Sequence, residues 1–261
     1  MRCPKPSSVI MLGLAFLLRY CFLASLRLLS RTFFYHQTEW VGPPPQRPFV
    51  NVRVTALLNH TSLFEAVLSG AFPPAFVADV CRRGLLPGAD TTMDRAVVGR
   101  FFKWMVPHWV SISRRRDSTW ERFLSLIGGD TLVLLFPEGR MRRRGGFDKH
   151  GRPMTVRGGI ADILERVDDG DLLIVYSEGL HHIHAPGDRF PGLFRPVRCR
   201  FEQLPIRRYK ELMRSGDPHF TRNVMHDLER RRDQHCLWDD QSVARGGPTE
   251  IPLHFPRRRQ P

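Results

Sequence analysis

The sequence predicts an α/β fold: a single layered domain with a central mixed sheet flanked by helices, preceded by an N-terminal membrane-associated helix. Two continuous apolar runs, TLVLLF (131–136) and LLIVY (172–176), are typical of strands buried on both faces. Segments with apolar residues every three or four positions, which predict amphipathic helices, lie between and around these runs. Strands that alternate with helices along a chain are characteristic of layered α/β domains.

Residues 1–48 are expected to hold an apolar helix and a linker. The most apolar stretch covers residues 9–29 and includes Arg19 and Arg27, whose charges are costly at the middle of a bilayer. We therefore expect a helix at the cytoplasmic membrane interface, with leucine and phenylalanine on one side and the arginines among anionic headgroups. The alternative is a soluble helix that docks on the domain. Residues 31–48 contain aromatic residues and then a Pro-rich break, which together predict the linker.

The main domain is expected at residues 49–215, and a C-terminal helix and basic tail at residues 216–261. Strands are predicted at 49–54, 110–113, 131–136, 172–176 and 194–201. Helices are predicted at 91–105, after the capping box Ser118-x-x-Glu121, over 160–167, and from Asp217 onward. A long basic loop is expected from Arg140 to Arg157, after one of the two buried strands.

Charge favours an anionic partner, because basic residues outnumber acidic residues by 40 to 26 and the net charge at pH 7 is +14. Nearly all of the basic residues are arginines, whose guanidinium geometry matches phosphate. Nucleic acid, an anionic membrane surface and a phosphorylated substrate all remain open on charge alone. We do not expect nucleic acid, because the runs Arg142–Arg144, Arg230–Arg232 and Arg257–Arg259 lack interleaved aromatic residues. An anionic membrane surface explains these runs equally well.

The cysteine and histidine patterns predict neither a disulfide framework nor a metal centre. The five cysteines are scattered and include no CxxC pair, which favours a reducing, cytosolic setting. His181, His182 and His184 lie close together, but no carboxylate at a suitable spacing completes a zinc-binding set. We therefore expect no metal site.

The first candidate site is Asn59–Glu65, NHTSLFE, just beyond a predicted strand. Five residues turn an α-helix by about 500°, so His60 and Glu65 do not share a helix face. If His60 lies in a loop and Glu65 in the first turn of the next helix, the carboxylate can hold one imidazole nitrogen. The other nitrogen can then accept a proton from a hydroxyl group. The alternative is that Ser62-x-x-Glu65 is a capping box and Glu65 only caps the helix.

Two further candidates lie where predicted strands end. Phe136–Arg140, FPEGR, follows a buried strand, and ligands bind at the ends of strands in open α/β sheets. A carboxylate there, beside a glycine that permits close approach of the backbone, can bind a polyol. Ser113–Arg116 places three arginines between a strand and a helix, where guanidinium groups and the helix N-terminus both favour phosphate. An ordinary turn and a solvated basic loop are the alternative interpretations.

In this order, the three segments resemble the glycerophospholipid acyltransferase superfamily, the PlsC-like 1-acyl-sn-glycerol-3-phosphate acyltransferases. That family carries an Asn-His block with an acidic residue five positions after the histidine, a middle block that ends in an arginine, and an FPEG block. Here the blocks are Asn59–Glu65, Val110–Arg114 and Phe136–Gly139. The resemblance covers roughly residues 50–205, and the order and placement of the blocks are fairly specific.

The resemblance implies transfer of an acyl group from acyl-CoA or acyl carrier protein to a hydroxyl group, usually of a lysophospholipid, with no cofactor. It makes His60 the general base and Glu65 the residue that orients it, although aspartate is commoner than Glu65 at that position. The alternative is a basic lipid-binding or nucleic-acid-binding protein without turnover.

The same resemblance implies a substrate-binding role for five residues. Arg114 would bind the acceptor phosphate, and Glu138 and Gly139 would help to shape the acceptor pocket. Arg140 stands where the family usually has threonine, and Arg157 stands in place of a common lysine. Because these positions differ from the family pattern, the resemblance predicts the class of reaction but not the headgroup of the acceptor.

Overall fold

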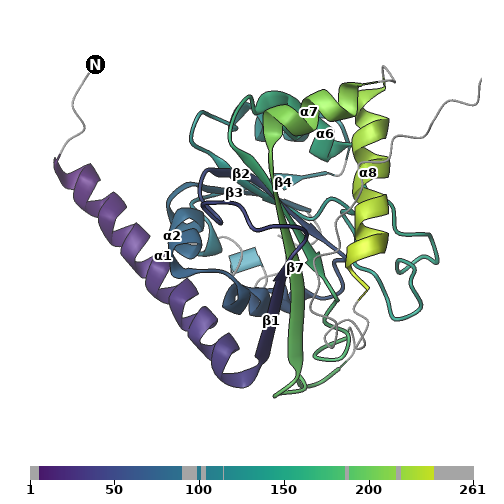
Figure 1. The fold of residues 1–261 in the computed structure, drawn as a ribbon. Helices are drawn as coiled ribbons and strands as arrows, with labels where there is room; N and C mark the ends of the chain where they lie inside the picture. Colours follow the sequence, from purple (N-terminus) through teal and green to yellow (C-terminus); the bar gives the residue numbers. More distant parts are fainter. Residues whose placement is uncertain are drawn as a thin grey trace, which may run out of the picture.

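The structure, a computed structural model, describes residues 6–89, 99–100, 104–113, 115–185, 188–215 and 219–237. In this part of the chain a seven-stranded sheet forms the centre of the molecule, in the order β1-β7-β6-β2-β5-β3-β4 (Figure 1). All neighbouring strands are parallel except β6 and β7, so the predicted mixed α/β sheet is confirmed. The strands are β1 (Tyr35–Trp40), β2 (Val52–Leu58), β3 (Gly84–Ala89), β4 (His108–Ile112), β5 (Leu132–Leu135), β6 (Asp171–Ser177) and β7 (Pro196–Pro205).

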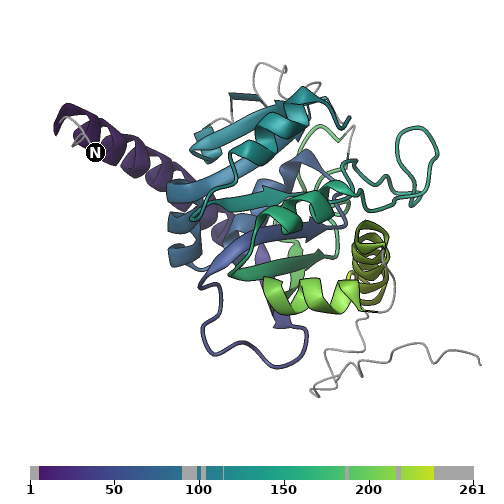
Figure 2. The same cartoon turned by 90° about the horizontal axis from the view of Figure 1, so that it is seen from above.

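Helices cover both faces of this sheet (Figure 2). One face packs against α5 (Ser118–Ser125), α6 (Gly159–Arg166), α7 (Ile206–Arg214) and α8 (Phe220–His235). The other face packs against α1 (Pro6–Phe33), the 3₁₀ helix η1 (Leu63–Ala71) and α2 (Pro74–Arg83). Two hydrophobic cores therefore lie on opposite sides of one sheet.

Alternation along β2 explains why this strand is buried on both faces. Val54, Ala56 and Leu58 point into the core beneath α5, α6 and α8, because successive side chains of a strand face opposite sides. Leu57 packs into the opposite core, and Thr55 lies on that same side. A strand with apolar surroundings on both faces, in the middle of a parallel array, can hold the loop that follows it in a fixed position.

Helix α1 has an apolar outer face, and its inner face combines apolar core residues with two arginines, which differs in part from the expectation. Its arginines do not point outward: Arg19 donates to the carbonyl oxygens of Cys81 (3.3 Å) and Trp104 (3.2 Å), and Arg27 donates to that of Phe72 (2.8 Å). These guanidinium groups satisfy carbonyl oxygens at the ends of α2 and η1 and in the segment around Trp104, so they are unavailable to headgroups. The exposed large hydrophobic side chains of α1 are Met11, Leu14, Leu17, Leu18, Leu28 and Leu29.

Among the described residues, α1 is the one helix that is long and apolar enough to cross a membrane, over Gly13–Phe33. Only about a tenth of that segment is buried against the rest of the protein. Length and composition alone do not distinguish a membrane helix from a docked helix or a signal sequence.

The prediction of a linker at residues 31–48 is wrong for the first half of that segment, which is helix and strand. Residues up to Phe33 continue α1, and β1 pairs in parallel with β7 over its whole length. The sequence YHQTEW lacks an apolar alternation because β1 is an edge strand with mostly exposed side chains. The pairing with β7 comes from a distant part of the chain, and the local sequence does not indicate it.

Other elements differ from their predicted bounds for local reasons. Asp117, not Ser118, caps α5, because its carboxylate accepts hydrogen bonds from the backbone N–H groups of Thr119 and Trp120. The segments α2, β3 and α7 were not predicted individually, whereas η1 is the helix expected around Glu65. The helix predicted at 91–105 lies mostly outside the described residues.

Candidate active site

The candidate residues gather where the parallel strands end. β2, β5 and β6 run in the same direction, so the loops that follow them meet at one edge of the sheet. The loop after β2 carries His60, the loop after β5 carries Glu138, and the loop after β6 carries Gly179. The sheet therefore brings together segments that lie about 80 and 120 residues apart in the sequence.

A sharp turn places His60 at this edge. Asn59 has a positive φ of 64°, which asparagine tolerates better than most residues, and its side-chain amide donates to the carbonyl oxygen of Ser177 (2.9 Å). On the other side of His60, the Thr61 hydroxyl accepts the N–H of Leu180 (2.7 Å). Both ends of the turn are thus bonded to the loop after β6.

Gly179 is required at this contact. Its φ is 95°, and a Cβ at this position would lie 2.9 Å from the methyl carbon of Thr61. Only glycine allows the two loops to approach this closely.

His60 and Glu65 form a hydrogen-bonded pair, which is the arrangement expected if His60 lies in a loop and Glu65 at the start of the next helix. Nδ1 of His60 bonds to Oε2 of Glu65, and Oε1 of Glu65 accepts the backbone N–H of Thr61 (2.9 Å). Ser62 caps η1 by accepting the N–H of Phe64 (3.1 Å). Glu65 therefore holds both the imidazole and the backbone of the turn, through the N–H of Thr61 and not through the N–H of Ser62 that a capping box would use.

Glu138 lies beneath His60 and does not face a substrate cavity. Its side chain is fully buried, with Oε2 accepting the backbone N–H of His60 (2.9 Å) and Oε1 accepting Nη1 of Arg232 (3.1 Å). The expected contact with an acceptor is thus replaced by a role in positioning His60. A buried carboxylate requires such charged and hydrogen-bonding partners.

Phe136 and Gly139 complete the surroundings of the imidazole. The Phe136 ring stacks on the His60 ring, with centroids 4.3 Å apart and an interplanar angle of 29°. Gly139 has a φ of 61° and closes a tight turn by donating its N–H to the carbonyl oxygen of Phe136 (2.9 Å). The turn directs Glu138 inward and leaves Gly139 at the surface of a cavity.

The electrostatic surroundings raise the pKa of His60. Burial by itself acts to lower this pKa, but the charge of Glu65, its hydrogen bond and the charge of Glu138 together outweigh burial. The pair of carboxylates therefore favours the protonated imidazole, which is the form that a general base adopts after it has taken a proton.

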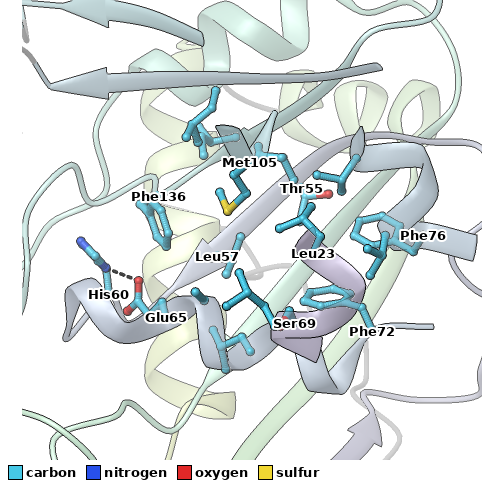
Figure 3. A pocket seen from close by; sticks show the side chains of 18 of the residues that line it. Leu23, Thr55, Leu57, His60, Glu65, Ser69, Phe72, Phe76, Met105 and Phe136 are labelled. Carbon is cyan, nitrogen blue, oxygen red and sulfur yellow. Dashed lines mark hydrogen bonds and ion pairs between the residues drawn. The ribbon is translucent and has the colours of Figure 1, made fainter. Parts of the chain in front are cut away.

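His60 lies where two cavities of different character meet. The first has a volume of about 130 Å³ and is almost wholly apolar, with walls from β2, η1, α1 and α2 (Figure 3). The second has a volume of about 550 Å³ and is lined by Arg115, Arg116, Arg140, Arg152 and Arg157. The residues that line both are His60, Leu86, Leu135 and Phe136.

The predicted substrate-binding arginines have different surroundings. Arg114 lies outside the described residues. Arg140 pairs with the buried Asp148 (2.5 Å), and its Nε is buried without a partner in the part of the chain that the structure describes. Arg157 is exposed and lies against Gly139 at the wall of the second cavity. Arg140, Arg157 and Gly139 therefore line the same cavity.

Two positioning residues were missed. Arg142 donates its backbone N–H to the carbonyl oxygen of His60 (2.7 Å), and its side chain contacts Oδ1 of Asn59 (3.3 Å). Arg232 belongs to a run that resembled surface charge, yet its side chain is largely buried and bonds Glu138. A signal was present, because Arg231 and Arg232 follow the buried Val224 and Leu228 at helical spacing on α8.

The histidines at 181–184 do not gather around a metal site in the described structure. There, no group of three or more His, Cys, Asp or Glu side chains could hold a metal ion. Instead, Nε2 of His181 lies within hydrogen-bond distance of the carbonyl oxygen of Arg142 (2.8 Å). Nε2 of His182 likewise lies close to the carbonyl oxygen of Pro196 (2.6 Å).

Comparison with known proteins gives likenesses in fold only, and these are distant. No protein-family model matches the chain, and no curated protein matches its sequence. One solved structure with a similar fold is the 1-acyl-sn-glycerophosphate (LPA) acyltransferase PlsC from Thermotoga maritima. It has a TM-score of 0.47 and 16% identity, and the match covers 83% of this chain and 81% of that one. At this distance the likeness assigns neither an activity nor site residues to the chain.

The Glu138–Arg232 pair predicts a large effect on stability. Arg232→Met leaves a buried carboxylate without its cationic partner, so the free energy of unfolding should fall by about 3–5 kcal/mol. Arg230→Met on the same helix removes a half-exposed guanidinium that pairs with Asp227, and should cost about 0.5 kcal/mol. Urea unfolding followed by circular dichroism measures both values.

The double variant Arg232→Met/Glu138→Gln separates loss of charge pairing from loss of packing. Because it removes both buried charges, it should be more stable than Arg232→Met alone. Equal losses for Arg232→Met and Arg230→Met would show that the pair does not support the loop.

Proposed function

We propose that the chain is an O-acyltransferase that moves a fatty acyl group from acyl-CoA or acyl carrier protein to a hydroxyl group of a lysophospholipid such as 1-acylglycerol-3-phosphate. The observation that carries this proposal is the position of His60, which is bonded to Glu65 and lies between an apolar cavity and an arginine-lined cavity. An acyl transfer to a phospholipid needs one site of each kind, with a base between them.

The apolar cavity suits the acyl chain of the donor. Its walls are formed largely by leucine, valine and phenylalanine side chains, which exclude water and favour a hydrocarbon chain. His60 and Glu65 lie at one end of this cavity in Figure 3, and Phe72 and Phe76 lie toward the other. A thioester whose chain fills the cavity would therefore have its carbonyl carbon near His60.

The arginine-lined cavity suits the phosphate of the acceptor. Guanidinium groups bind phosphate through charge-assisted hydrogen bonds. Arg157 is exposed at the wall of this cavity, where it lies against Gly139. We assign the acceptor contact first to Arg157, with Arg115 beside it in the same cavity.

His60 acts as the general base in this mechanism. Its Nε2 takes the proton of the acceptor hydroxyl while the oxygen attacks the thioester carbonyl carbon. Glu65 stabilises the imidazolium that forms, as the carboxylate of a Ser-His-Asp triad does. The tetrahedral intermediate then collapses, the C–S bond breaks, and the leaving thiolate takes the proton from His60. The products are the acylated acceptor and a free thiol.

Direct transfer agrees with the chemistry of the three buried cysteines among the described residues. Burial raises the pKa of the Cys81 thiol to about 11 and that of Cys199 to about 12, so both are poor nucleophiles near neutral pH. Cys236 is also buried, and burial raises its pKa. None of these three lines either of the two cavities.

The outer face of α1 supports attachment to a membrane surface. Met11 and Leu28 are 69% and 66% exposed, and the other exposed leucines of the helix are Leu14, Leu17, Leu18 and Leu29. A row of exposed apolar side chains of this size favours burial in a lipid surface. We propose that the protein lies on an anionic membrane at its cytoplasmic face, where acceptor lipids are present.

Removal of the base should abolish transfer. His60→Ala should lower kcat by about 10²–10⁴-fold, because it removes the imidazole that takes the proton. His226→Ala, which removes an exposed histidine on α8, should leave kcat unchanged. Radiolabelled acyl-CoA and lysophosphatidate, followed by lipid separation, give the rates. Near-normal turnover by a correctly folded His60→Ala protein would remove His60 from the mechanism.

The raised pKa of His60 predicts the direction of the pH dependence. The base must be neutral to accept a proton, and a raised pKa means that neutral imidazole predominates only at higher pH. The value of kcat/KM should therefore rise with pH, with a midpoint above the ordinary value of 6.5. A profile measured from pH 5 to pH 9 with a midpoint below 6.5 would contradict this electrostatic account.

Membrane attachment should depend on the outer leucines of α1. Leu14→Gln/Leu28→Gln should strongly reduce flotation with vesicles that contain phosphatidylglycerol, because it places two amides in the contact face. Leu126→Gln/Leu193→Gln changes two equally hydrophobic, exposed residues elsewhere and should leave flotation unchanged. If both double variants float like the wild type, α1 does not provide the contact.

A further inference from the structure

Two hydroxyl groups in the apolar cavity have no hydrogen-bond partner in the described structure. They are Oγ1 of Thr55 on β2 and Oγ of Ser69 on η1, and both atoms are buried. Thr55 as a whole has no exposed surface. Figure 3 shows both side chains at the cavity, on the sheet wall and on the η1 wall respectively.

The other polar side chains of the cavity are already bonded. His60 and Glu65 bond to each other, and Ser62 accepts the N–H of Phe64. Thr55 and Ser69 therefore differ from every other polar group that lines the cavity. A buried hydroxyl without a partner destabilises the protein, whereas valine and alanine would occupy nearly the same space without that cost. Two such hydroxyls in one apolar cavity point to a bound polar group.

The two hydroxyls lie at a distance from the reacting end. Thr55 precedes the end of β2 by three residues and His60 by five, which corresponds to roughly 10–16 Å along an extended strand. Ser69 follows Glu65 by four residues of 3₁₀ helix, which corresponds to roughly 8 Å. A zigzag carbon chain advances about 1.25 Å per carbon. A group that reaches these hydroxyls would thus lie roughly 6–13 carbons from a thioester at His60.

We propose that the apolar cavity selects acyl donors that carry a hydroxyl group near the middle of the chain, bound by Thr55 and Ser69. This inference rests on the proposed function. A hydroxyl group both donates and accepts, so it complements the two side chains without requiring a charge. The apolar walls on either side would bind the methylene groups before and after it.

The test compares two C18 donors that differ in one oxygen atom. The full chain is given octadecanoyl-CoA and 10-hydroxyoctadecanoyl-CoA in competition, with lysophosphatidate as acceptor. The wild type should favour the hydroxylated donor by at least about tenfold in kcat/KM, since a site built around a hydroxyl group rejects the analogue that lacks it. Thr55→Val/Ser69→Ala should reverse the preference, and Ser125→Ala, at an exposed position on α5, should not change it.

A binding measurement separates this inference from the proposed function. Octadecanoic acid and 10-hydroxyoctadecanoic acid are titrated into the wild type and the double variant by calorimetry, with melting temperatures as the control for folding. Tighter binding of the hydroxylated acid, lost in the double variant, supports the inference even if neither donor is turned over. Equal turnover of the two donors, or equal affinity for the two acids, overturns the inference and means that these hydroxyls bind water.

Discussion

The hydrogen bond between Nδ1 of His60 and Glu65 fixes which imidazole nitrogen is available for chemistry. When Nδ1–H donates to the carboxylate, Nε2 keeps its lone pair and can take a proton from a bound hydroxyl group. The backbone leaves the pair little freedom, because Glu65 also accepts the Thr61 N–H and Glu138 accepts the His60 N–H. The strand ends, the turn at Asn59 and the close approach of Gly179 all hold this imidazole at the junction of two cavities.

The position of the imidazole depends on a buried charge that a distant helix neutralises. Glu138 has no exposed surface, and such a carboxylate persists only with a cationic partner and hydrogen bonds. Arg232 supplies the partner from α8, and Arg231 attaches the same helix to β7 through Glu202. The C-terminal helix therefore belongs to the site as much as the loop after β2 does.

The parts that could be predicted from sequence are those with local causes. His60 and Glu65 are five residues apart, so their pairing required only a turn and the start of a helix. The partner of Glu138 could not be predicted in the same way, because 94 residues separate it from Arg232. Strand β1 was missed because its pairing with β7 is equally remote, and the outward arginines expected on α1 instead bond carbonyl oxygens of segments that only the fold brings near.

The account assigns the two cavities to the two sides of one reaction, with His60 between them. Its most direct test is a structure of the protein bound to a non-hydrolysable thioether analogue of acyl-CoA. We expect the hydrocarbon chain in the cavity bounded by Phe72 and Phe76, with the carbon that replaces the thioester carbonyl beside Nε2 of His60. A chain bound elsewhere, with His60 out of reach of the sulfur end, would contradict the account.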